Sequence, residues 1–239
     1  MIIMLYLIGL GLGSEKSLTM EGLEAAKKCE CYFESYTSKY DSFELLEKLV
    51  GKKIAVLKRG DAEEGSQKIL DSAKRKDVAV FVIGDPLAAT THADLVIEAK
   101  KQKIQIRIIH NASIFSAVAE CGLQLYKFGR AATIPYTKQA ESVKDALEGN
   151  RKLGLHTLLL LDLDAEKDRY MNVEEALEIL LEKKLISEKE KLIAAHISGN
   201  SQIFYDIPEE LVKKKIGTPS VLIVPGKLHF VEKEFLELI

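Results

Sequence analysis

The residues best suited to ligand chemistry are Gly84, Asp85 and Pro86, which directly follow the apolar run at residues 78–83. An uninterrupted apolar run that ends at glycine and aspartate is typical of a buried strand whose carboxyl end faces a ligand in an α/β sheet. Asp85 suits an ordinary turn equally well, because its carboxylate accepts hydrogen bonds from the nearby backbone. Two interpretations of Asp85 therefore stand at this point, a turn former and a ligand-binding residue.

A second turn, at residues 9–14, is rich in glycine and follows the first predicted strand. The dinucleotide fingerprint G-x-G-x-x-G fails here, because Ser14 stands where its third glycine belongs. The glycines still allow the backbone to approach a ligand closely. Glu34, at the end of the second predicted strand, is placed like the ribose-binding acid of dinucleotide sites. A dinucleotide-binding oxidoreductase therefore stays an alternative.

A third turn, at residues 110–114, carries the chain from a predicted strand into a predicted helix. Ser113 has two interpretations there. It is a preferred residue for capping a helix, and its hydroxyl with nearby N–H groups also suits a carboxylate held at a helix N-terminus.

The five histidines are scattered and do not form a metal-binding pattern. No pair has the i, i+4 spacing of a helical metal site, so we predict no metal and expect each histidine to be hydrogen-bonded within the structure. The chain also lacks a G-x-S-x-G elbow and a Cys/His signature, and no catalytic residue or proton acceptor is assigned. The histidines are His92, His110, His156, His196 and His229.

Composition narrows the class of protein. The chain has 239 residues, 47% of them hydrophobic, and a net charge of −2, which disfavours nucleic acid as a partner. Its three cysteines are too few for a disulfide framework and fit a reducing cytoplasm. Residues 1–13 are apolar without a basic leading segment, so we expect a buried strand rather than a signal peptide. We expect no membrane partner.

The first half of the chain alternates between predicted strands and helices. This alternation favours a parallel five-stranded sheet with helices on both faces. The predicted strands are residues 1–8, 31–33, 54–57, 78–83 and 104–109.

The second half has longer polar connections, such as residues 198–206, and predicts a mixed sheet with helices. Asn172 and Glu175 have the spacing of a capping box that opens a helix. We place the domain boundary after Asn111, giving α/β domains at 1–111 and 112–239, with a ligand site expected in the cleft between them. The predicted strands are residues 131–134, 156–163, 192–197 and 221–224.

Taken together, these turns carry a resemblance that no single one does. The opening motif at residues 9–13, with Leu18-Thr19 and Ala25 after it, resembles that of the tetrapyrrole methylase superfamily. Further segments resemble one branch of it, the diphthine synthases, and the similarity runs from the first strand nearly to the last residue. These segments are residues 84–92, 113–114, 122–129, 154–162 and 224–229.

The resemblance implies a two-domain methyltransferase, usually a homodimer, that binds S-adenosylmethionine in the interdomain cleft without a metal. Its expected substrate is translation elongation factor 2, whose modified histidine carries a 3-amino-3-carboxypropyl group. Repeated methylation of that amino group gives the trimethylammonium of diphthine. A tetrapyrrole such as a precorrin stays an alternative substrate, because the opening motif is common to the superfamily, and a non-catalytic binding module would need only the cleft.

The resemblance also implies eight residues that contact the cofactor. Near one of them the sequence departs from the family, because residues 195–199 read Ala-His-Ile-Ser-Gly where the family has Ala-Arg-x-Gly-Ser. Residues 136–150 form a shorter segment than in the family, with Val143 where a tyrosine is common, and contacts with the protein substrate are left unassigned. The eight residues are Leu12, Asp85, Ala88, Ser113, Ile114, Leu161, Ile197 and His229.

Overall fold

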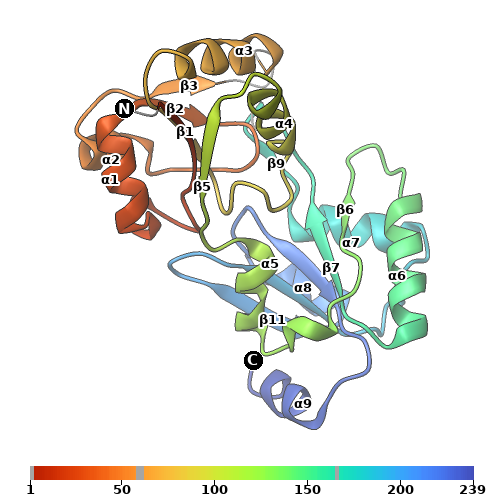
Figure 1. The fold of residues 1–239 in the computed structure, drawn as a ribbon. Helices are drawn as coiled ribbons and strands as arrows, with labels where there is room; N and C mark the ends of the chain where they lie inside the picture. Colours follow the sequence, from red (N-terminus) through yellow and green to blue (C-terminus); the bar gives the residue numbers. More distant parts are fainter. Residues whose placement is uncertain (1–2, 58–61, 165–166) are drawn as a thin grey trace. The chain divides into compact units, whose positions relative to one another are not determined.

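The computed structural model describes residues 3–57, 62–164 and 167–239, and it divides the chain into two compact units (Figure 1). Of the described residues, the first unit comprises 3–57, 62–115 and Lys167, and the second comprises Ser116–Asp164 and Asp168–Ile239. The division after Phe115 falls close to the boundary that the sequence predicts after Asn111. Each unit has its own sheet and hydrophobic core.

The first unit is built on a five-stranded parallel sheet with the order β3-β2-β4-β1-β5. All residues of β4 are buried, as expected of a central strand in a sheet covered on both faces. The sheet confirms the prediction from the alternating pattern. Its strands are β1 (Met4–Gly9), β2 (Glu30–Glu34), β3 (Ala55–Leu57), β4 (Val78–Val82) and β5 (Gln105–Ile109).

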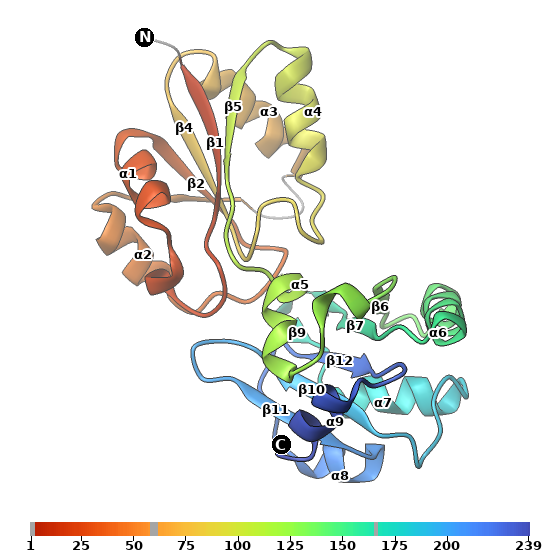
Figure 2. The same ribbon diagram turned by 60° about the horizontal axis from the view of Figure 1, so that its bottom comes forward.

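Helices cover both faces of this sheet (Figure 2). Successive side chains of a strand point to opposite faces, so an apolar strand such as β4 presents apolar side chains to both layers of helices. Ala79 and Phe81 of β4 belong to the core under α1 (Met20–Lys28) and α2 (Phe43–Val50). Val78, Val80 and Val82 belong to the core on the other face. That face is covered by α3 (Ala62–Ala73) and α4 (Ala93–Lys101).

The second unit contains a mixed sheet with the order β11-β10-β12-β7-β6, as the sequence predicts. Strands β6 and β7 pair parallel, whereas the other neighbours pair antiparallel. A short ribbon of β8 (Leu163–Asp164) and β9 (Arg169–Tyr170) follows β7. The sheet strands are β6 (Ala132–Ile134), β7 (Thr157–Leu161), β10 (Leu192–His196), β11 (Gln202–Asp206) and β12 (Val221–Val224).

Strand β11 corrects the expectation that residues 198–206 form a polar connection. Its residues pair antiparallel with β10, from Leu192 opposite Asp206 to His196 opposite Gln202. As the edge strand it is only partly buried, so it lacks the continuous apolar run that marks a central strand. The β-favouring residues Ile203, Phe204 and Tyr205 were the available signal.

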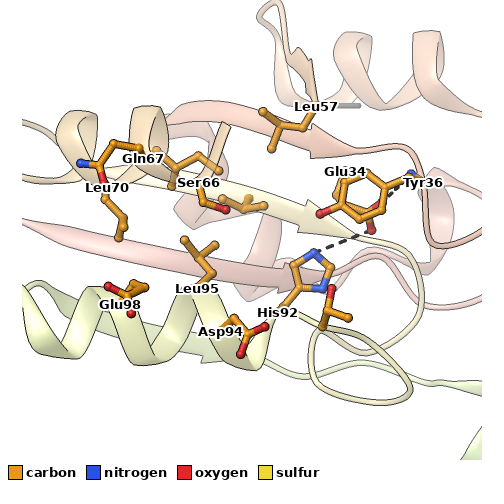
Figure 3. Close-up of a pocket in the computed structure, with 13 residues that line it drawn as sticks. Glu34, Tyr36, Leu57, Ser66, Gln67, Leu70, His92, Asp94, Leu95 and Glu98 are labelled. Carbon is orange, nitrogen blue, oxygen red and sulfur yellow. Dashed lines mark hydrogen bonds and ion pairs between the residues drawn. The ribbon is translucent and has the colours of Figure 1, made fainter. Parts of the chain in front are cut away.

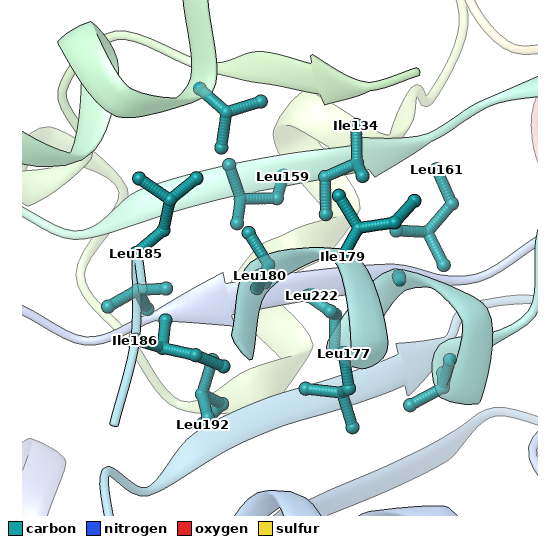
Figure 4. Close-up of a cluster of buried hydrophobic side chains, with 14 of the residues drawn as sticks. Ile134, Leu159, Leu161, Leu177, Ile179, Leu180, Leu185, Ile186, Leu192 and Leu222 are labelled. Carbon is teal, nitrogen blue, oxygen red and sulfur yellow. The ribbon is translucent and has the colours of Figure 1, made fainter. Parts of the chain in front are cut away.

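Helix α7 (Val173–Glu182) shows how local sequence and packing cooperate in the second unit. Asn172 Oδ1 accepts a hydrogen bond from Glu175 N at 2.9 Å, and Glu175 Oε2 accepts one from Asn172 N at 3.0 Å, which confirms the capping box. Leu177 and Leu180 on the buried side of this helix pack with strand residues that include Leu159 (Figure 4). This face forms the core of the second unit.

Of the remaining helices, α6 (Glu141–Leu153) and α8 (Pro208–Lys213) contribute Val143, Leu147 and Leu211 to the core of the second unit, and the others are short. None of the helices among the described residues is both long and apolar enough to cross a membrane. The short helices are α5 (Ile114–Ala117), α9 (Phe230–Leu236), and the 3₁₀ turns η1 (Glu15–Ser17), η3 (Val118–Cys121) and η4 (Leu125–Lys127).

Candidate functional site

Two of the glycine-bearing turns meet directly at the carboxyl end of the first sheet. Gly11 N donates to Gly84 O at 3.1 Å, and Gly84 N donates to Gly11 O at 3.0 Å. Both residues have a positive φ, +69° and +75°, which glycine adopts without strain. A Cβ on Gly9 would lie 2.6 Å from Gly84 O, so the close approach of these turns depends on glycine.

Asn111 fastens the third turn to the first. Its side-chain Nδ2 donates to Gly9 O and to Ser17 O, both at 2.9 Å, and its Oδ1 accepts from Ala112 N at 2.8 Å. These bonds hold the segment before α5 against the end of β1. The three turns that the sequence singles out therefore form one cluster of loops beyond β1, β4 and β5.

Asp85 links two of these turns. Its Oδ1 accepts a hydrogen bond from Leu87 N at 3.0 Å, and its Oδ2 accepts one from Asn111 N at 3.2 Å and lies 2.7 Å from His110 Nδ1. Burial by itself raises the pKa of Asp85, but the hydrogen bonds from Leu87, His110 and Asn111 outweigh it and hold the pKa below its usual value. Asp85 thus forms the expected turn bond and also presents an ionised carboxylate in the loop cluster.

The structure brings five of the eight predicted cofactor residues into this loop cluster. Ala88 N donates to Asp85 O at 3.3 Å, and Leu12 O accepts from Ser17 Oγ at 2.8 Å. Ser113 is buried beside Gly84, and a Cβ on Gly84 would lie 3.9 Å from Ser113 Cα and Cβ. The five residues are Leu12, Asp85, Ala88, Ser113 and Ile114.

The other three predicted residues lie in the second unit, at two different ends of its sheet. Leu161 ends β7 and Ile197 follows β10, and these strand ends share one end of the sheet because both pair antiparallel with β12. His229 follows β12, whose last residue Val224 pairs with Thr157 at the start of β7. Within this unit, the structure therefore groups Leu161 with Ile197 but not with His229.

The loop that carries His229 is held by Glu232, a fully buried carboxylate. Glu232 Oε2 accepts from His229 N at 2.7 Å and pairs with Lys127 Nζ, while Oε1 accepts from Gln124 N at 2.9 Å. His156 Nε2 lies 3.1 Å from Oε1. Burial alone raises the pKa of Glu232, but these donors together lower it to about 2.

His156 connects the Glu232 carboxylate to the same loop from the other side. Its Nδ1 accepts a hydrogen bond from Gly226 N at 2.9 Å, so we assign the imidazole proton to Nε2, which donates to Glu232. A Cβ on Gly226 would lie 2.5 Å from backbone atoms of Gly154 and Leu155, so glycine allows these backbones to pack closely. The buried pair therefore fixes residues 225–229 against the start of β7.

His92 departs from the expectation that each histidine is hydrogen-bonded. His110, His156, His196 and His229 all have hydrogen-bond partners. His92 is 5% exposed, and among the described residues neither of its ring nitrogens has a hydrogen-bond partner. Burial lowers the pKa of His92 to about 4, so the imidazole is neutral at pH 7.

His92 and Glu34 line a cavity of about 340 Å³ inside the first unit (Figure 3). His92 Nε2 lies 3.8 Å from Glu34 Oε2. The sequence did not identify this pairing, although His92 ends the segment at residues 84–92 and Glu34 ends the second predicted strand. The available signal was that both residues follow buried strands of a parallel sheet, whose carboxyl ends meet at one edge.

Comparison with known proteins adds independent information. The family described as Tetrapyrrole (Corrin/Porphyrin) Methylases matches residues 4–210. Diphthine synthase of Methanocaldococcus jannaschii is 41% identical over 251 residues, which cover 98% of this chain and 98% of that protein. Diphthine methyl ester synthase of Schizosaccharomyces pombe is 40% identical over 263 residues, covering 98% of this chain and 93% of that protein.

A solved structure shows the same fold. The crystal structure of a diphthine synthase superposes with a TM-score of 0.91 at 36% sequence identity, covering 98% of this chain and 95% of that chain. The likeness therefore extends over both units and includes the loop segments described above.

We predict that Glu232→Gln destabilises the protein at pH 7 by on the order of 3 kcal/mol, because Lys127 loses its buried charge partner. The folded pKa of Glu232, about 2, lies below the ordinary value of 4.5, so its contribution is present above pH 4.5 and is lost as the pH falls toward 2. Urea unfolding from pH 7 down to pH 3 measures both effects. The exposed control Glu178→Gln should follow the wild type, and equal pH slopes for Glu232→Gln and wild type would contradict the assignment.

Proposed function

The chain belongs to the tetrapyrrole methylase family and, within it, to the diphthine synthases, and from this premise we propose that it acts on translation elongation factor 2. The acceptor is the amino group of the 3-amino-3-carboxypropyl-histidine, which repeated methylation converts to the trimethylammonium of diphthine. The observation that carries this proposal is the match to diphthine synthases over nearly the full length of both proteins. The chain is therefore a methyltransferase of the diphthamide pathway.

We propose S-adenosylmethionine as the methyl donor. When bound, it supplies an electrophilic methyl group on a sulfonium, which an amine attacks in line. The loop cluster fits such a molecule, because glycine backbone borders Ser113 and the ionised carboxylate of Asp85 accepts hydrogen bonds from hydroxyl or ammonium groups. The eight residues from Leu12 to His229 remain the proposed contacts.

Positioning accounts for the chemistry that this chain must supply. An amine attacks a sulfonium methyl group directly, without a covalent enzyme intermediate. Holding the amine and the methyl donor in line speeds this reaction, because fixed orientation removes much of the entropic barrier. Asn111 and the paired glycines hold the loop cluster rigidly. The cytoplasmic location expected from the cysteine content stays a prediction.

We also propose that the protein forms a homodimer through an apolar surface on the second unit. This surface comprises Leu125 and Tyr126 of η4 with Phe230, Phe235 and Leu238 at the C-terminus. Tyr126 is 81% exposed, Phe230 71% and Leu238 81%. The two elements lie together because Phe235 packs on Gly122 and Glu232 binds Lys127. Large exposed apolar side chains on two elements in contact are typical of a protein interface, and a cyclic dimer is the commonest assembly.

Light scattering coupled to size exclusion tests the dimer. We expect wild-type protein to elute as a dimer and Phe230→Asp to elute as a monomer, because a buried unpaired carboxylate opposes association. Leu45→Asp is the matched control, since Leu45 is an exposed leucine on α2, 47% exposed and outside this surface. A dimeric Phe230→Asp would contradict the proposed surface, and a monomeric wild type would contradict the dimer.

The protein substrate is tested with radiolabelled S-adenosylmethionine and purified elongation factor 2. We expect methyl transfer to the factor that carries the aminocarboxypropyl histidine and none to the unmodified factor, because the acceptor amine is absent from the latter. Mass spectrometry of the product counts the methyl groups added. Equal labelling of both factors, or labelling of a precorrin instead, would overturn the proposed substrate.

Calorimetric titration with S-adenosylmethionine tests the loop cluster. We expect Asp85→Ala to weaken binding about tenfold or more, because a hydrogen bond to a charged group is lost. Ser113→Ala should also weaken binding, whereas loss of a helix cap alone would reduce stability by about 1 kcal/mol without changing affinity. Asp71→Ala, an exposed aspartate on α3, serves as the control. Unchanged affinity in both loop variants would leave these residues with structural roles only.

A further inference from the structure

The cavity beside His92 lies wholly within the first unit, at the carboxyl end of β2 and the start of α4. Figure 3 shows Glu34, Tyr36 and His92 grouped at one end of it, with Leu70 and Leu95 further along. Its volume is about 340 Å³, which is the size of a pocket for a small ligand or a large side chain. Carboxyl ends of parallel strands are where α/β sheets bind ligands.

Glu34 is an ordered carboxyl group that is fully buried at this end of the cavity. One of its oxygens, Oε1, accepts a hydrogen bond from Thr37 N at 2.8 Å and from Tyr36 N, and Oε2 accepts one from Thr37 Oγ1 at 2.5 Å. These bonds fix the orientation of the carboxyl group. Oε2 is the oxygen nearer to His92.

Hydrogen bonding within the described residues does not account for the burial of His92. A buried polar group without a partner costs about 1–3 kcal/mol, and its two ring nitrogens have none among the described residues. Burial lowers the pKa of His92 to about 4 and raises the pKa of Glu34, so an ion pair between the two does not account for the buried imidazole. A leucine in the same place would avoid this cost, so the imidazole is best explained by a ligand that it contacts.

The lining of the cavity indicates the chemistry of that ligand. It includes three carboxyl groups, those of Glu34, Asp94 and Glu98, and none of the described lining residues is a lysine or arginine. The Tyr36 ring is stacked on the His92 ring, with 6.4 Å between centroids. Carboxyl groups accept hydrogen bonds from an amine, and an aromatic face attracts ammonium groups that carry methyl substituents. The cavity is therefore suited to an amino group, neutral or methylated, on an apolar stem.

We infer that this cavity binds the acceptor side chain of elongation factor 2 through its amino group, with Glu34 and His92 as the residues that position it. This inference rests on the proposed function. One loop supports it, because residues 84–92 carry Asp85 and Ala88 of the proposed donor site at one end and His92 at the other. Acceptor and donor contacts then come from the same short segment.

The test is His92→Leu, measured for both stability and kinetics. We expect urea unfolding to show equal or greater stability than wild type, because an unpartnered polar group is removed. We expect KM for the modified elongation factor 2 to rise about tenfold or more, with unchanged affinity for S-adenosylmethionine by calorimetry. A purely structural role for His92 would instead lower stability and leave KM unchanged, and that result overturns the inference.

Glu34→Gln provides the second variant, because it keeps the shape of the side chain and replaces the carboxyl group by an amide. We expect it to raise KM for the modified factor and to weaken binding of a trimethylated product peptide. Asp71→Asn removes an exposed carboxylate that does not line the cavity and should behave as wild type. Wild-type kinetics in both His92→Leu and Glu34→Gln overturn this inference alone, whereas failure of the wild-type enzyme to label the modified factor overturns the proposed function as well.

Discussion

The candidate site of the first unit depends on the backbone contact between Gly11 and Gly84. These residues exchange two hydrogen bonds beyond the ends of β1 and β4 and form an antiparallel bridge, which joins the loops that follow two neighbouring parallel strands. A side chain at Gly9 would collide with Gly84 O. The positions of Asp85 and, through Asn111, of the segment before α5 all follow from this close approach.

The second unit orders its loop by a different means, a buried charge network instead of backbone pairing. Glu232 holds residues from η4, from the start of β7 and from its own helix. Such a carboxylate is costly to bury, and its low pKa shows that the surrounding donors compensate that cost. The contrast with His92 is instructive, because His92 is also buried but lacks comparable partners. Donors within the structure account for the burial of Glu232, whereas the partner that we propose for His92 is a ligand.

Sequence patterns predicted the long, periodic elements well and the edge of the second sheet poorly. Central strands such as β4 are buried on both faces, so a continuous apolar run in the sequence predicts them. The edge strand β11 is half-buried and depends on pairing with β10, which no local pattern encodes. The capping box at Asn172 was predictable because its two partners are three residues apart.

The sequence by itself determined the two α/β sheets, the three turns that follow β1, β4 and β5, and the resemblance to a methyltransferase family, because these depend on residues that are close together in the chain. Tertiary structure decided which side chains meet. Asp85 bonds to Asn111, 26 residues away in the sequence, and Glu232 bonds to His156, 76 residues away. Glu34 at the end of β2 approaches His92 at the start of α4. The order of strands in each sheet decides which of these residues come together in space. That order arises from long-range packing, and local sequence patterns do not predict it.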